Sequence, residues 1–251
     1  MDQKTIHHLN QINLDFYNTV SKSFNQSRMS PWNGWSQVLK EAQAVLGDKK
    51  SLKILDLGCG NGRWGTFIAA ETDNLEITYV GIDGNSALLQ YACQDLLPKV
   101  KVLELKLQDL QSFLAGDQAE QLRNKVDLIV MFGVWHHLPG EENRANIVKN
   151  IAHLLAPNGV LAISCWRFLR SDQLQQRLVE PSHVAISQDC LEEGDYFLDW
   201  RAGTPAIRYC HDTDPDEIVN QAAAANLKLQ SSFSADGKTG NLNDYYLFSP
   251  R

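Results

Sequence analysis

Apolar runs alternate with segments of helical periodicity between residues 53 and 166. The apolar runs predict strands at 53–55, 77–82, 100–105, 126–132 and 160–166, and the most continuous run, 126–132, is typical of a strand buried on both faces. Apolar residues at helical spacing between these runs predict helices at 65–72, 85–97 and 142–155, with a further helix ending near 121. Such alternation predicts right-handed crossovers, and therefore an α/β fold with a parallel central sheet and helices on both faces.

The chain departs from this alternation near both ends. Residues 16–24 carry apolar side chains at helical spacing and predict an amphipathic helix that packs on the core. Residues 215–225 predict a helix, and 227–233 and 244–248 predict an antiparallel pair of strands. We expect a single domain with four parts: an N-terminal helical cap (1–50), the core (53–166), an insertion (167–211), and the last helix with its strand pair (212–251). Substrate choice is expected to lie in the cap and the insertion.

The composition is that of a soluble globular protein, with 43% hydrophobic and 21% charged residues in a chain of 251. Long apolar runs are missing and the first part of the chain is polar and amphipathic, so we expect neither a membrane span nor a signal peptide. The five cysteines are scattered, odd in number and without C-x-x-C spacing. They predict reduced thiols in a cytoplasmic protein, without a disulfide framework and without a bound metal.

The net charge of −7 argues against a protein that binds nucleic acid over its whole surface. Basic residues nevertheless gather in two places, at Lys22 and Arg28 and at Arg167, Arg170 and Arg177. Two alternatives stay open for them: a local path for RNA, or an ordinary solvated surface.

The segment 54–62, ILDLGCGNG, is the most informative part of the chain. A short strand ends at Asp56, and glycine then occupies every second position, at 58, 60 and 62. Glycine permits positive φ and lets a ligand approach the backbone, and a helix beginning near Asn61 would offer unpaired N–H groups. A dinucleotide site has the spacing G-x-G-x-x-G, whereas here the third glycine comes one residue early. Asp56 would repel a pyrophosphate but would suit a cationic amino group.

Two further acids follow the next two predicted strands. Asp83 ends the run 77–82, and Asp109 follows the run 100–107. A carboxylate at the position of Asp83 can accept hydrogen bonds from two ribose hydroxyls. Either acid alone could equally be a helix cap, but the order and spacing of all three acids favour a nucleoside-binding site at the carboxyl ends of the strands.

The order of these motifs resembles that of class I S-adenosylmethionine-dependent methyltransferases. The resemblance implies S-adenosyl-L-methionine as the cofactor and a Rossmann-like fold with a C-terminal antiparallel strand. It also implies that Asp109 holds the adenine amino group. On this basis we expect the cofactor to contact Asp56, Gly58, Cys59, Gly60, Asn61, Gly62, Asp83, Gly84, Asp109, Leu110 and Gly133.

Three other segments resemble the tRNA wobble-uridine methyltransferases, which esterify a 5-carboxymethyluridine side chain in the anticodon. They are FNQSRMSPW at 24–32, VWHHL at 134–138, and DYFLDWRAGTPAIRYCH at 195–211. This resemblance implies tRNA as the acceptor and a small helper subunit that covers an apolar edge.

The chemistry of the acceptor decides which side chains are needed. A carboxylate is already ionised at pH 7, so it requires an orienting cation and not a base. Arginine suits a carboxylate because its fork binds both oxygens. We expect Arg208 first and Arg28 second in this role, supplemented by Tyr209 and His211. A hydroxyl or amine acceptor would need a base, and His136 or His137 is then the candidate, although a histidine at such a turn often only bonds a backbone carbonyl.

The tryptophans and the overall function leave alternatives open. Trp135 and Trp166 could stack on a base or a cofactor, but we expect buried core positions for both and for Trp200. Besides methylation of tRNA, the sequence allows methylation of a small-molecule acid or hydroxyl. It also allows a non-catalytic nucleoside-binding module, although the intact acids and glycines favour an enzyme.

Overall fold

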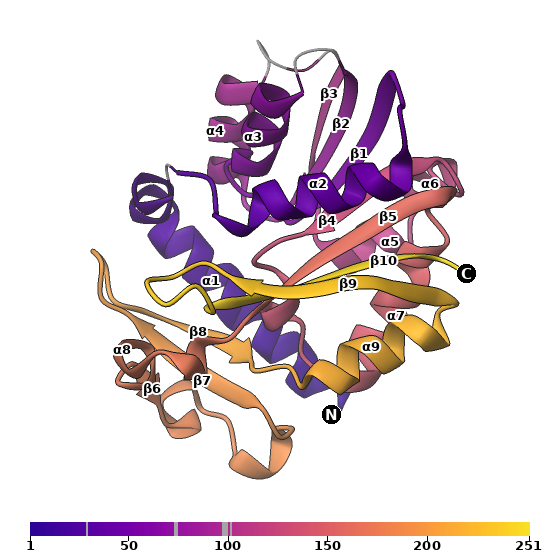
Figure 1. The fold of residues 1–251 in the computed structure, drawn as a ribbon. Helices are drawn as coiled ribbons and strands as arrows, with labels where there is room; N and C mark the ends of the chain where they lie inside the picture. Colours follow the sequence, from indigo (N-terminus) through magenta and orange to yellow (C-terminus); the bar gives the residue numbers. More distant parts are fainter. Residues whose placement is uncertain (29, 73–74, 97–99, 101) are drawn as a thin grey trace.

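The structure is a computed structural model that describes residues 1–28, 30–72, 75–96, 100 and 102–251. A seven-stranded sheet forms its centre (Figure 1). Its strand order is β3-β2-β1-β4-β5-β10-β9. The strands are β1 (Ser51–Leu57), β2 (Glu76–Asp83), β3 (Val102–Leu107), β4 (Val126–Met131), β5 (Leu155–Trp166), β9 (Leu227–Ala235) and β10 (Asn243–Pro250). Neighbours among β1 to β5 pair in parallel, and β10 is antiparallel to both β5 and β9. The predicted α/β class with its parallel core and C-terminal antiparallel strand is confirmed.

Helices cover both faces of the sheet, because successive side chains of each buried strand point to opposite faces. One face packs against α2 (Gly34–Leu46), α3 (Arg63–Glu71) and α4 (Ser86–Leu96). The other packs against α5 (Leu110–Leu114), α6 (Asp117–Gln121), α7 (Glu141–Ala152) and α9 (Pro215–Ala224). In the strand β1, for example, Ile54 faces the first group and Leu55 the second. Within the described residues, no helix is both long and apolar enough to cross a membrane.

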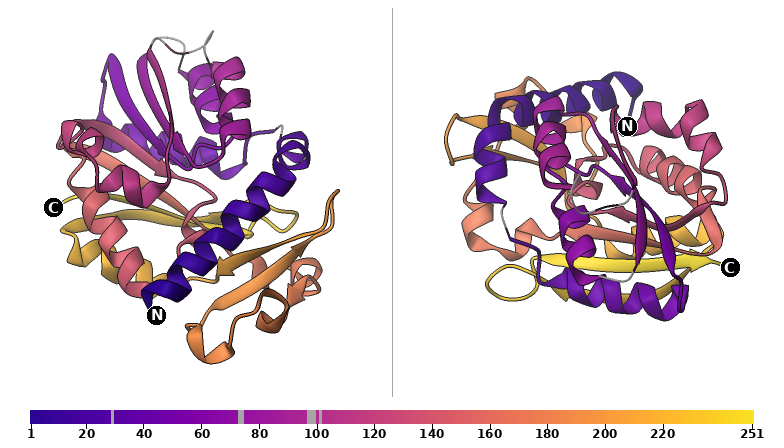
Figure 2. Two further views of the ribbon diagram at one scale, coloured as in Figure 1. Left: turned by 180° about the vertical axis from the view of Figure 1, so that it is seen from behind. Right: turned by 90° about the horizontal axis from the view of Figure 1, so that it is seen from above.

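The cap and the insertion form a separate layer. Helix α1 (Gln3–Ser27) is much longer than the predicted segment 16–24, and it buries Leu9, Phe16 and Val20. The insertion contains the short helix α8 (Asp172–Gln175) and an antiparallel sheet of β6 (Leu178–Val179), β7 (Asp195–Trp200) and β8 (Ala206–His211), which the sequence did not predict. Figure 2 shows α1 lying between this small sheet and the central fold.

The main differences from the predicted boundaries lie at turns. Helix α3 begins at Arg63 and not near Asn61, because Gly62 has a φ of +74° and ends the turn there. Strand β5 starts at Leu155 and not at 160 as predicted, and its pairing with β4 shifts register between Val126 and Leu128. Position 97 of the predicted helix 85–97 and position 101 of the third predicted strand lie outside the described residues.

Candidate active site

A cavity of about 790 Å³ opens at the carboxyl ends of the parallel strands. Its walls come from the loop after β1, the ends of β2, β3 and β4, helix α1 and residues of β8. Of the eleven residues predicted to hold a cofactor, all but Gly62 line this cavity. A side chain at Gly62 would meet Ala92 and Leu96, so this glycine allows α3 and α4 to pack closely.

The glycine loop is held open toward the cavity by backbone hydrogen bonds. Gly58, Gly60 and Gly62 all have positive φ, as the sequence predicted. The N–H groups of Gly58 and Cys59 donate to the carbonyl of Ile82, and the Gly60 N–H donates to Asp83 Oδ2 at 2.8 Å. A side chain at Gly58 would collide with Val134, whereas none of the described residues lies within 4 Å of a side chain built at Gly60. The loop therefore leaves room for a ligand beside Gly60.

The three predicted acids all line the cavity, but their pKa values and hydrogen bonds differ. Asp56 is 2% exposed, and burial raises its pKa to about 7 even though the Tyr79 hydroxyl donates to it. Burial also raises the pKa of Asp83, opposed by hydrogen bonds from the N–H groups of Asn85 and Gly60. Asp109 caps helix α5 by accepting from the Ser112 N–H at 2.9 Å, which is the alternative role that the sequence allowed. A cationic group beside Asp56 would favour its ionised form.

Arg208 is a buried cation without an acidic partner among the described residues. Its side chain is 6% exposed, and its guanidinium lies 4.4 Å from the ring centroid of Trp166, 5.3 Å from Phe16 and 5.9 Å from Trp200. Its Nε atom has no hydrogen-bond partner in the part of the chain that the structure describes. A buried charge in this state costs several kcal/mol unless an anion joins it. The geometry therefore fits an anionic ligand.

Two further arginines line the same cavity. Arg28 lies over the ring of Phe24 at 5.2 Å, and burial and the nearby Arg208 lower its pKa. Arg63, which the sequence analysis missed, lies over Trp32 and Trp35 and donates to the Ser30 carbonyl. Burial lowers its pKa to about 10. Its position directly after the last glycine of the loop was the signal that could have identified it.

The paired histidines follow β4 and face the cavity in different ways. His137 Nδ1 lies 2.8 Å from the Tyr209 carbonyl, as the structural alternative predicted, and Nε2 lies 2.9 Å from the Tyr17 hydroxyl. Burial and Arg208 lower the pKa of His137 to about 3. His136 packs against Trp166 with its Nδ1 unpartnered, and burial holds its pKa well below the ordinary value. Both rings are therefore neutral at pH 7.

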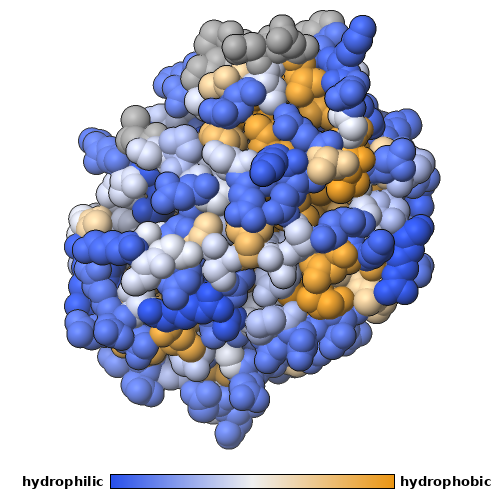
Figure 3. Space-filling view, in the orientation of Figure 1, coloured by the Kyte–Doolittle hydropathy of each residue, from blue (hydrophilic) through white to orange (hydrophobic). Residues whose placement is uncertain are grey.

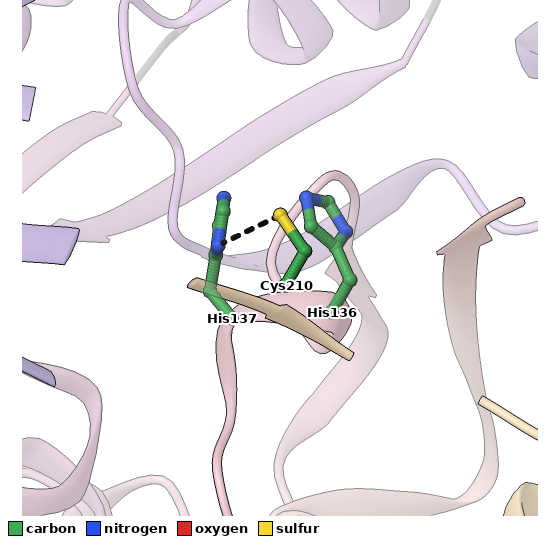
Figure 4. Close-up of side chains that lie close together, drawn as sticks. All are labelled: His136, His137 and Cys210. Carbon is green, nitrogen blue, oxygen red and sulfur yellow. Dashed lines mark hydrogen bonds between the residues drawn. The ribbon is translucent and has the colours of Figure 1, made fainter. Parts of the chain in front are cut away.

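His136, His137 and Cys210 bring three possible metal ligands within 4.8 Å of one another (Figure 4). The hydrogen bonding does not favour a metal there. His137 Nδ1 points at a carbonyl that can only accept a hydrogen bond, and burial raises the pKa of the Cys210 thiol to about 12. The neighbouring Arg208 would also repel a cation. The prediction that the protein binds no metal stays a prediction.

Tyr209 and His211 lie outside the cavity, which differs from their expected position beside Arg208. Both bond Asp195, at 2.7 and 2.8 Å, and His211 Nε2 lies 3.3 Å from Glu217. Hydrogen bonds from His211 and Arg144 outweigh the effect of burial and hold the pKa of Glu217 at about 2. This buried network joins the small sheet to α7 and α9, because the strand alternation of β8 turns Tyr209 and His211 away from Arg208.

The remaining candidates are mostly structural. Arg170 forms two hydrogen bonds with Asp244, and Arg167 forms ion pairs with Asp212 and Asp244. Trp135 is fully buried in the core, and Trp200 is 7% exposed, as predicted. Trp166 instead lines the cavity beneath Arg208.

Comparison with known proteins agrees with this site. Residues 55–161 match the family model described as a methyltransferase domain. The chain is 24% identical to the tRNA (carboxymethyluridine(34)-5-O)-methyltransferase of Saccharomyces cerevisiae over 60% of this chain and 46% of the relative. It is 31% identical to trans-aconitate 2-methyltransferase of Methylobacterium radiotolerans over 51% of this chain and 40% of the relative. The chain thus spans less than half the length of either relative.

Solved structures show the same fold. An S-adenosylmethionine-dependent methyltransferase from Clostridium acetobutylicum superimposes with a TM-score of 0.62 and 14% identity, covering 94% of this chain and 98% of that chain. Residues 55–161 thus match a methyltransferase domain, and the chain has the Rossmann-like fold of this S-adenosylmethionine-dependent methyltransferase. The predicted resemblance to this class, including its tRNA-modifying members, is confirmed.

Proposed function

We propose that this protein is an S-adenosylmethionine-dependent methyltransferase that esterifies a carboxylate, with a carboxymethyl-uridine of tRNA as the leading acceptor. The observation that carries this proposal is Arg208, a buried guanidinium that faces the cavity without an acid among the described residues. An uncompensated buried charge lowers stability, and an anionic acceptor would offset that cost.

The residues of the cavity fit the cofactor. Asp109 and Leu110 would flank adenine, Asp83 would accept hydrogen bonds from the ribose, and the buried carboxyl of Asp56 suits an ammonium group. The remainder of the cofactor would lie beside the open side of Gly60 and near Gly84, Asn61 and Gly133. Cys59 would fill space beneath the loop. When bound, S-adenosylmethionine supplies a methyl group on a sulfonium sulfur.

Arg208 would orient the acceptor carboxylate, and Arg28 would add a second positive charge. Held in this way, a carboxylate oxygen would be the nucleophile for the methyl group, and the electron pair of the broken sulfur–carbon bond would remain on sulfur. No proton moves, so neutral His136 and His137 are not required as bases. Positioning alone can supply about 7–11 kcal/mol of the acceleration in favourable cases.

The choice between RNA and a small acid as the acceptor depends on the relatives and on the basic residues around the cavity. Both relatives named above act on carboxylate-bearing acceptors, one in tRNA and one a small acid. Arg28 lines the cavity and Lys22 lies on α1, whereas Arg167 and Arg170 are engaged by acids and contribute little to an RNA path. The small acid is therefore retained as the second candidate. The four-part division of the chain, a cytoplasmic location and the small helper subunit remain part of the proposal.

For the helper subunit, the edges of the sheet are the relevant surface. The edge strands β3 and β9 expose Leu107 and Leu229, which are 61% and 36% exposed. On the face in Figure 3, separate hydrophobic areas lie among hydrophilic residues.

The acceptor can be identified with methyl-labelled S-adenosylmethionine and extracts of cells that lack this protein, separated into RNA, protein and small molecules. We expect label in RNA. Label confined to small molecules would keep the enzyme class and replace tRNA by a small acid. Binding of the cofactor with no transfer to any fraction would favour the non-catalytic nucleoside-binding module.

A further inference from the structure

Tyr17 of helix α1 lines the cavity, and its hydroxyl takes part in a hydrogen-bond chain whose direction is fixed. The Tyr209 carbonyl can only accept, so His137 Nδ1, 2.8 Å away, carries the hydrogen. The ring is neutral, since burial lowers its pKa to about 3, and Nε2 therefore has a bare lone pair. The Tyr17 hydroxyl, 2.9 Å from Nε2, must donate its hydrogen to it.

Asn13 Nδ2 also lies near His137 Nδ1, at 3.2 Å, but the Tyr209 carbonyl is nearer, at 2.8 Å, and decides the tautomer. The side-chain Oδ1 of Asn13 accepts from the Tyr209 N–H at 2.9 Å, which turns its Nδ2 toward His137. Because His137 Nδ1 already carries a hydrogen, Nδ2 is left to donate to the His137 carbonyl at 3.5 Å. The Tyr17 hydrogen is therefore committed to His137, and the oxygen of Tyr17 can only accept from anything in the cavity.

The neighbours of Tyr17 place it beside both parts of the proposed site. Its ring lies 5.1 Å from that of Phe16 and 5.3 Å from that of Phe24, and the guanidinium groups of Arg208 and Arg28 lie over these two rings. The next residue, Asn18, accepts from Asn85 Nδ2 at 3.0 Å, and the Asn85 N–H donates to Asp83, so this turn of α1 is tied to the end of β2. Tyr17 therefore lies in the same cavity as the ribose site at Asp83 and the acceptor site at Arg208, and close to both.

We propose that the Tyr17 hydroxyl oxygen accepts a C–H···O contact from the methyl group of bound S-adenosylmethionine and orients it for transfer. This inference rests on the proposed cofactor. A methyl group on a positively charged sulfur is an effective C–H donor, and the oxygen offers lone pairs that a carboxylate acceptor, having no proton, would not use. His137 is then a positioning residue that acts through Tyr17 and not a general base.

The experiment compares S-adenosylmethionine with S-adenosylhomocysteine, which lacks the methyl group. Titration calorimetry on wild type, Tyr17→Phe and the control Tyr246→Phe, a buried tyrosine outside the cavity, gives six affinities. We expect Tyr17→Phe to weaken S-adenosylmethionine about two- to fivefold and to leave S-adenosylhomocysteine unchanged. The control should change neither.

Proton NMR of bound, methyl-¹³C-labelled S-adenosylmethionine provides a second readout. The methyl protons should shift downfield in wild type relative to the free cofactor, and the shift should shrink in Tyr17→Phe. Equal weakening of both ligands by Tyr17→Phe, no weakening of either, or a wild-type methyl shift equal to that of the free cofactor would overturn the role of Tyr17. Failure of wild type to bind either ligand would instead overturn the proposed function.

Discussion

Two buried arginines allow the function of Arg208 to be separated from its contribution to stability. Arg208 and Arg144 are 6% and 1% exposed. Arg144 Nε donates to Glu217 at 2.6 Å, whereas Arg208 has aromatic neighbours and no acid among the described residues. Replacing each by methionine removes the same charge and keeps an unbranched side chain of similar length. The two substitutions should have opposite consequences.

For stability, the partner of each arginine decides the size of the effect. Arg144→Met removes the guanidinium that neutralises Glu217 and leaves it only His211 and Gln221 as partners, which should lower the free energy of unfolding by about 3–5 kcal/mol. Arg208→Met loses cation–π contacts of about 0.5–2 kcal/mol, but it also removes the cost of burying an unpaired charge, which is several kcal/mol. We expect its free energy of unfolding to change by about 1 kcal/mol or less, or to rise.

For activity, Arg208→Met should have a larger effect than Arg144→Met. Hydrogen bonds from a guanidinium to a carboxylate contribute about 1.5–3 kcal/mol each, so the loss of two should raise the barrier by about 3–4 kcal/mol after partial compensation. This corresponds to a fall in kcat/KM for the acceptor of about 10²- to 10³-fold, with the affinity for S-adenosylmethionine unchanged.

Urea unfolding and transfer of labelled methyl to the acceptor measure the two quantities on the same preparations. Arg144→Met, assayed where it is still folded, should retain most of its activity. A folded Arg208→Met protein with wild-type kcat/KM would refute the reasoning, as would destabilisation as large as that of Arg144→Met.

Three other substitutions test the cofactor site and the histidine cluster. The pKa of Asp56 is raised to about 7, so the unliganded fold loses stability as pH rises through that value and the buried carboxyl ionises. An ammonium group pairs with the ionised carboxylate, so the bound cofactor should raise Tm more at pH 8 than at pH 6. Asp56→Asn should remove this difference, and an unchanged difference in thermal-shift assays would exclude Asp56. Asp83→Ala should weaken S-adenosylhomocysteine binding by calorimetry at least about 100-fold, and retained affinity would exclude the ribose assignment. Cys210→Ala and treatment with a chelator should leave methyl transfer unchanged, whereas a loss restored by added zinc would establish a metal at His136, His137 and Cys210.

Local patterns were sufficient to predict the core and the cofactor side of the site. Apolar runs marked the strands β1 to β5, and parallel strands place their carboxyl ends at one edge, so Asp56, Asp83 and the glycine loop had to meet. Gly62 was the exception, because its packing against α4 depends on a contact between segments about thirty residues apart, which the loop motif does not encode.

The acceptor side was harder to predict because it depends on tertiary contacts of the cap and the insertion. The strand β8 places Arg208 in the cavity and turns Tyr209 and His211 toward Asp195, and the strand itself was not predicted. Tyr17 was interpreted only as part of a helix face packed on the core. Its pairing with His137, about 120 residues away, is visible only in the folded protein.

The central claim is that the methyl group is transferred to a carboxylate. The most direct test is to label the acceptor with wild-type protein and methyl-labelled S-adenosylmethionine, treat it with mild alkali, and measure volatile label. Release of most of the label as methanol, lost with Arg208→Met, is the result that we predict. Label that stays on the acceptor through alkali would mean transfer to nitrogen or to a hydroxyl oxygen and would contradict the assignment of Arg208.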